Sequence, residues 1–99
     1  MKIKIGMLEY EVKFLDKKLE FDGDKVFGQV DECAQVIKIS TKACKTDARI
    51  RQTVLHEVLH AAGWYCGIDL PEPEVVALGN VLSDMLYESP GLLDLHRKK

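Results

Sequence analysis

The chain has 99 residues, of which 46% are hydrophobic and 30% charged, the composition of an ordinary globular domain with a single modest core. Its formal net charge of −2 gives no basis for binding nucleic acid or an anionic membrane surface. No apolar run approaches the roughly 20 residues needed to cross a bilayer. We therefore expect one domain, residues 1–99, with no nucleic-acid or membrane partner.

The first half of the sequence predicts β-structure. Apolar residues alternate with polar ones, or follow one another in short runs, in four segments: residues 3–5, 10–14, 26–30 and 35–40. Gly6 and Asp22-Gly23-Asp24 mark turns between them. These features predict a small antiparallel sheet of three to four strands.

The second half predicts two helices, so the fold class is α+β with the sheet preceding the helices. Residues 48–66 contain no proline and place Ile50, Val54, Val58 and Ala61 at helical spacing. Asp47 is expected to cap this helix at its start, and Gly67 to end it. Pro73 suits the first turn of a second helix, which we expect to run to about Glu88.

The segment His56-Glu57-Val58-Leu59-His60 carries the clearest chemistry. Two imidazoles four residues apart lie on one face of a helix, where both can bind one metal ion. Glu57 lies about 100° around the helix from His56, so it can reach a water on the metal more easily than the metal itself. H-E-x-x-H is the motif of zinc-dependent peptidases, in which the glutamate is the general base. We expect one Zn²⁺ ion bound by His56 and His60, with Glu57 as the catalytic residue.

A catalytic zinc site needs a third protein ligand, and several residues compete for that position. We favour Glu74, because it heads a stripe of the second helix that continues through Leu78, Val81 and Met85. A carboxylate at the head of an apolar stripe should point inward, where it needs a partner. Cys66 is the main rival, since H-E-x-x-H-x-x-G-x-x-C is similar to the metzincin pattern with cysteine in place of the third histidine. The remaining candidates are Asp69, Glu72, Asp84 and His96.

Four segments carry a resemblance to a known family: Gly28-x-Val30-Asp31, Val36-x-Lys38-Ile39, residues 53–61 around the H-E-x-x-H motif, and Glu74-x-x-Ala77. Together they resemble small phage and prophage gluzincin-like metallopeptidases akin to the ImmA/IrrE family, over most of the chain. The resemblance implies a minimal zincin-like core and zinc bound by His56, His60 and Glu74. It also implies that Glu57 is the base and that the substrate is a peptide or protein.

Other observations bear on the compartment and on alternative functions. The start of the chain lacks the apolar segment of a signal peptide, and three cysteines do not suggest a disulfide framework. We therefore expect a cytoplasmic protein, in the host cytoplasm if it is phage-encoded. The main alternative to a peptidase is a catalytically inert, zinc-stabilised binding module, which the short chain favours and an intact Glu57 disfavours. A third interpretation has no metal, with both histidines packed in the fold. Apolar stripes on both helices fit either a monomer or a dimer.

Overall fold

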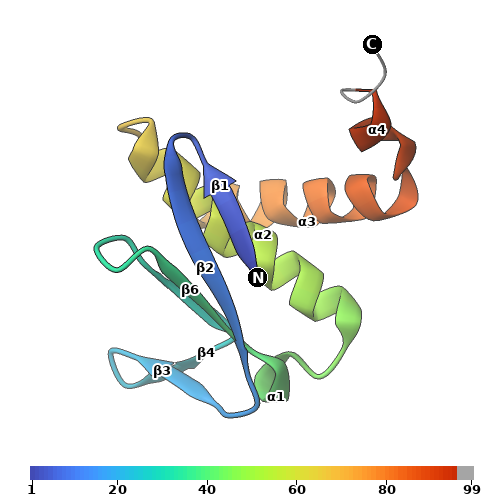
Figure 1. Cartoon of the computed structure of the whole chain (residues 1–99). Helices are drawn as coiled ribbons and strands as arrows, with labels where there is room; N and C mark the ends of the chain where they lie inside the picture. Colours follow the sequence, from blue (N-terminus) through green and yellow to red (C-terminus); the bar gives the residue numbers. More distant parts are fainter. Residues whose placement is uncertain (96–99) are drawn as a thin grey trace.

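The computed structural model describes residues 1–95 and confirms the α+β class. Its strands are β1 (Lys2–Ile5), β2 (Leu8–Leu15), β3 (Leu19–Phe21), β4 (Asp24–Val26), β5 (Gly28–Asp31) and β6 (Val36–Ser40). Its helices are α1 (Thr41–Cys44), α2 (Asp47–Tyr65), α3 (Glu72–Glu88) and α4 (Gly91–Asp94). The two long helices are those that the sequence predicts, and both follow the strands in the chain (Figure 1).

The main sheet has four strands in the order β1-β2-β6-β5. The β1–β2 and β5–β6 pairs are antiparallel, as expected. The β2–β6 pair is parallel, with Val12 opposite Ile37 and Phe14 opposite Ile39, so the expectation of a wholly antiparallel sheet is wrong for this pair. Parallel neighbours need a long crossover, which residues 16–35 provide. That crossover contains a second, two-stranded sheet formed by β3 and β4.

Two tight turns join the hairpins at the predicted positions. Gly6 occupies the first position of the β1–β2 loop with a φ of 62°, a conformation that suits glycine. Asp22 and Gly23 form the β3–β4 loop with φ values of 52° and 82°, the pattern of an Asp-Gly turn with positive φ at both positions.

Helix α2 has a defined cap at each end. Thr46, rather than the expected Asp47, is the N-cap, and its side-chain oxygen accepts a hydrogen bond of 3.2 Å from the Arg49 backbone N–H. At the other end Gly67 has a φ of 76° and donates to the Trp64 carbonyl, while the next residue donates to the Gly63 carbonyl. This pair of bonds is a Schellman motif, and it confirms Gly67 as the stop signal.

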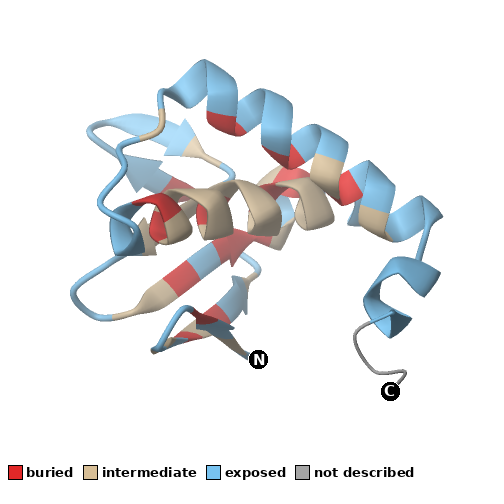
Figure 2. Cartoon of the chain, turned by 90° about the horizontal axis from the view of Figure 1, so that it is seen from above, coloured by how far each residue is buried: buried red, intermediate tan, exposed pale blue. Residues whose placement is uncertain are grey.

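Helix α2 lies between the sheet and α3 (Figure 2). On the sheet side it covers a core of fully or nearly fully buried residues: Ile5, Tyr10, Val12, Ile37, Ile39, Cys44 and Ala61. Ile50, Val54 and Val58 pack against this core, as their helical spacing predicts. The sheet-facing side of α2 therefore holds the fold together, which leaves another side of the same helix for chemistry.

Helix α3 packs on α2 through small side chains. Its buried residues are Val75, Gly79 and Ser83, and a Cβ added at Gly79 would lie 3.6 Å from the His56 backbone. The two helices thus approach closely beside the motif, at a distance that a methyl group at position 79 would fill in ordinary van der Waals contact. Among the helices of residues 1–95, none combines the length and apolar character needed to span a membrane.

Candidate metal centre

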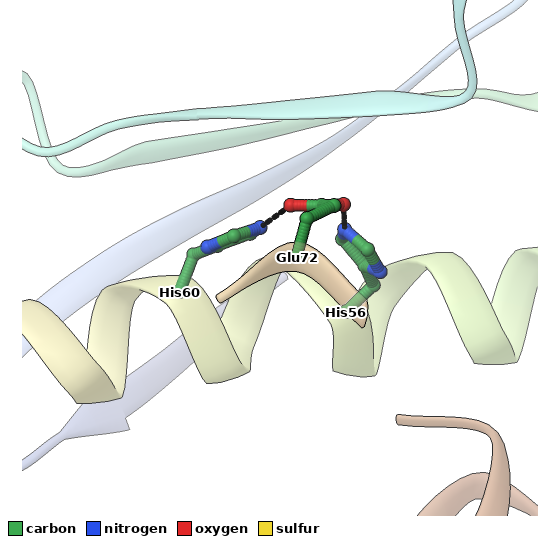
Figure 3. Close-up of side chains that lie close together, drawn as sticks. All are labelled: His56, His60 and Glu72. Atoms are coloured by element: carbon green, nitrogen blue, oxygen red, sulfur yellow. Dashed lines mark ion pairs between the residues drawn. The ribbon is translucent and has the colours of Figure 1, made fainter. Parts of the chain in front are cut away.

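Helix α2 presents His56 and His60 side by side, one turn apart, with ring centroids 5.0 Å apart. Glu72, the first residue of α3, extends its carboxylate between them (Figure 3). The His56 Nε2 atom lies 2.7 Å from one carboxylate oxygen, and the His60 Nε2 atom lies 3.0 Å from the other. Both imidazoles therefore direct the same nitrogen atom at one shared partner.

This group has a donor set that could hold a metal ion. Within residues 1–95, the three side chains each offer one ligand atom, and those atoms lie within 4.8 Å of one another. Two nitrogens and one carboxylate oxygen form a common protein ligand set for zinc, with a fourth position left for water or substrate. Ligands at about 2 Å from a common tetrahedral ion lie about 3.3 Å apart, which is near the imidazole-to-carboxylate distances of 2.7 and 3.0 Å and within the 4.8 Å that spans the group. The group can therefore hold a metal ion after small side-chain adjustments.

The structure brings Glu72, and not Glu74, to the histidines. Glu74 is exposed, as are Leu78, Val81 and Met85, the apolar residues that suggested an inward-facing stripe. The inward face of α3 is defined instead by Val75, Gly79 and Ser83, since only small side chains fit the close contact with α2. Position 72 lies three and seven residues before Val75 and Gly79, so it shares their face.

The other candidate ligands lie elsewhere. Cys66 is the exposed C-cap of α2, where the helix ends without turning back toward His60. Asp69 and Asp84 are exposed, the first in the connection between the helices and the second on α3. His96 lies outside the described residues. Within residues 1–95, none of these other candidates belongs to the cluster formed by the two histidines and Glu72.

Glu57 lies next to this group but is far more buried than Glu72. It is 8% exposed, and this burial raises the pKa of its carboxyl to about 7, with the negative charge of Glu72 adding to the shift. Its side chain also contributes to the wall of the cleft described below. A carboxyl in this position can accept and return a proton near neutral pH.

A cleft of about 840 Å³ runs past the histidines. One wall is β5 with the end of the β3–β4 hairpin, and the other is the outward side of α2 with the start of α3. Residues from these elements that the sequence analysis did not single out include Phe21, Lys25, Phe27, Arg49, Val76 and Asn80. Trp64 also lines the cleft, and its ring stacks on that of His60 at a centroid distance of 6.0 Å.

The tyrosines near the motif and on α3 do not reach the cleft. The Tyr65 ring packs against Gly6, so closely that a side chain on Gly6 would collide with the ring. The Tyr87 ring lies under the guanidinium of Arg51. Neither residue lines the cleft wall. Neither tyrosine is therefore placed to hydrogen-bond to a molecule bound in the cleft.

Comparisons of the chain with protein-family models, with curated proteins and with solved structures found no match. The fold and the cluster define an α+β domain in which two histidines and a glutamate from adjoining helices can hold a metal ion.

Proposed function

We propose that the protein is a zinc-dependent metallopeptidase in which His56, His60 and Glu72 hold one Zn²⁺ ion. The observation that carries this proposal is the convergence of three zinc-type donors, next to a buried glutamate, on the wall of a large cleft. The H-E-x-x-H motif and its resemblance to gluzincin-like peptidases akin to the ImmA/IrrE family support the same function.

Glu57 is the residue that moves protons in the proposed reaction. A zinc ion held by His56, His60 and Glu72 would polarise the scissile carbonyl and lower the pKa of water toward 7. Glu57 accepts a proton from the attacking water and then donates it to the leaving amine. Its pKa of about 7 suits both transfers, and the field of a nearby cation would lower that pKa and favour the ionised, proton-accepting form.

The cleft can accept a peptide in extended form. β5 is an edge strand of the main sheet, and Gly28, Gln29 and Val30 of this strand line the cleft. An edge strand presents unpaired backbone groups that can bind another chain. A cytoplasmic peptide or protein segment lying between β5 and α2 would pass His56 and His60.

Zinc analysis combined with a proteolysis assay tests this function. We expect the purified protein to bind one zinc ion and to cleave an unstructured protein such as casein or a mixed peptide library. Glu57→Gln should retain the zinc and reduce cleavage by at least about 100-fold, the contribution of a general base. Unchanged cleavage by the zinc-loaded variant would contradict the proposal. Stoichiometric zinc with no cleavage by the wild type would favour an inert, zinc-stabilised binding module instead.

A further inference from the structure

Arg49 places a positive charge in the cleft at a fixed distance along α2 from the histidines. Arg49, His56, His60 and Trp64 all lie on the cleft side of α2, spaced so that they form one stripe along the helix. Arg49 precedes His56 by seven residues, which corresponds to about 10 Å along the helix axis. An extended peptide covers that distance with about three residues.

The guanidinium of Arg49 is held in place without a carboxylate partner. Its central carbon lies 4.9 Å from the centroid of the Phe27 ring, which also lines the cleft. None of the ion pairs among residues 1–95 includes Arg49. Stacking on a ring occupies the flat face of a guanidinium and leaves the N–H groups at its edge available for two parallel bonds to a carboxylate.

The charged side chains that line the cleft indicate what Arg49 can bind. Its lining includes two cations, Arg49 and Lys25, and two carboxylates, Glu57 and Glu72. Both carboxylates have roles at the proposed zinc site, whereas neither cation has one. A carboxylate on a bound peptide could therefore pair with Arg49 without displacing a carboxylate of residues 1–95 from it.

We infer that the cleft selects peptides carrying a carboxylate about three residues from the scissile bond, and that Arg49 recognises it. This inference rests on the proposed peptidase function and names the substrate class of that site. The carboxylate can be an Asp or Glu side chain or the C-terminus of the peptide, because both offer the same pair of oxygens. Lys25 adds positive charge to the same cleft.

Peptide binding to zinc-loaded Glu57→Gln protein tests the inference without requiring cleavage. The probes are fluorescein-labelled, amidated octapeptides with a single Glu moved through successive positions, each paired with a Gln peptide. A further pair differs only in having a free or an amidated C-terminus. Fluorescence anisotropy should show one placement of the carboxylate that tightens binding about tenfold, as expected for a charge-assisted bidentate contact.

Arg51 offers a matched control, because it lies on the same helix and stacks on Tyr87 at 3.8 Å but does not line the cleft. Arg49→Gln should abolish the preference for the carboxylate, Arg49→Lys should retain part of it, and Arg51→Gln should leave it unchanged. Equal binding of all paired peptides, or no binding of any, would overturn the inference, as would a preference that survives in a folded Arg49→Gln protein. Circular dichroism establishes that each variant is folded.

The two proposals fail in different ways. If the wild type cleaves the Glu and Gln peptides equally well, the peptidase proposal stands and the role of Arg49 is refuted. If the carboxylate peptides bind through Arg49 and the wild type cleaves none of them, the recognition stands and the peptidase proposal fails.

Discussion

Replacing Glu72 with glutamine tests the proposed ligand set, and Glu74→Gln is its matched control. Both changes remove one negative charge from the first turn of α3 at nearly constant side-chain size. Glu72 contacts both histidines, whereas Glu74 is exposed and outside the metal-binding group. We therefore expect Glu72→Gln to weaken zinc binding and Glu74→Gln to leave it unchanged.

The size of the effect can be estimated. Losing a residue that merely orients a zinc ligand weakens binding by about 10- to 100-fold, so losing a direct ligand should weaken it by at least about 100-fold. With zinc in excess over both dissociation constants, a 100-fold change removes about 2.7 kcal/mol of stabilisation by the ion. For a domain of this size, that loss lowers the Tm by about 10 to 20 °C.

Two measurements check this prediction. Competition with a chromogenic chelator gives the zinc affinity, and circular dichroism gives the Tm with and without excess zinc. Without zinc, all three proteins should unfold at similar temperatures, because the Glu72 side chain is 60% exposed and its pairing with the histidines contributes little. The ligand assignment is refuted if Glu72→Gln keeps wild-type affinity, or if Glu74→Gln loses as much as Glu72→Gln.

Four further predictions concern stability. The raised pKa of Glu57 means that the folded, metal-free protein binds this proton more tightly than the unfolded chain, so the contribution of Glu57 to stability should fall by about 3 kcal/mol between about pH 4.5 and 7. Urea unfolding across that range should show a smaller fall for Glu57→Gln than for the wild type. Gly79→Ala should stabilise the protein by up to about 1 kcal/mol, because the new Cβ meets its neighbours at 3.6 Å or more. Gly63→Ala should destabilise it, because its Cβ would lie 2.9 Å from the Ile68 carbonyl oxygen, and a higher urea midpoint would contradict this. Ile37→Ala should cost about 2 to 5 kcal/mol in the same assay, since Ile37 is fully buried, and a loss below 1 kcal/mol would contradict its place in the core.

The sequence predicted α2 accurately because several independent signals agree there. The spacing of Ile50, Val54 and Val58 indicates the face that packs on the core, and Gly67 ends the helix through its positive φ. The parallel β2–β6 pairing was not predictable in the same way. Alternation of apolar residues shows which face of a strand is buried, but it does not show which neighbour the strand pairs with or in which direction.

The sequence favours Glu74 because large apolar residues usually mark the inward face of a helix, whereas the structure places Glu72 beside the two histidines. Close contact with α2 requires small residues, so Val75, Gly79 and Ser83 lie inward while Leu78 and Val81 remain exposed. The signal that identifies Glu72 is its spacing of three, seven and eleven residues from those small side chains. Arg49 left no such signal, because its position over Phe27 depends on contacts between distant parts of the chain.

A metal ion bound at this site would also affect how firmly α2 and α3 are held together. Small side chains bring the two helices close together but supply little apolar area to hold them. A metal ion bound by His56 and His60 of α2 and by Glu72 of α3 would link the two helices directly. Zinc supply would then govern how firmly the C-terminal helices are anchored to the rest of the domain, as well as whether the domain can react.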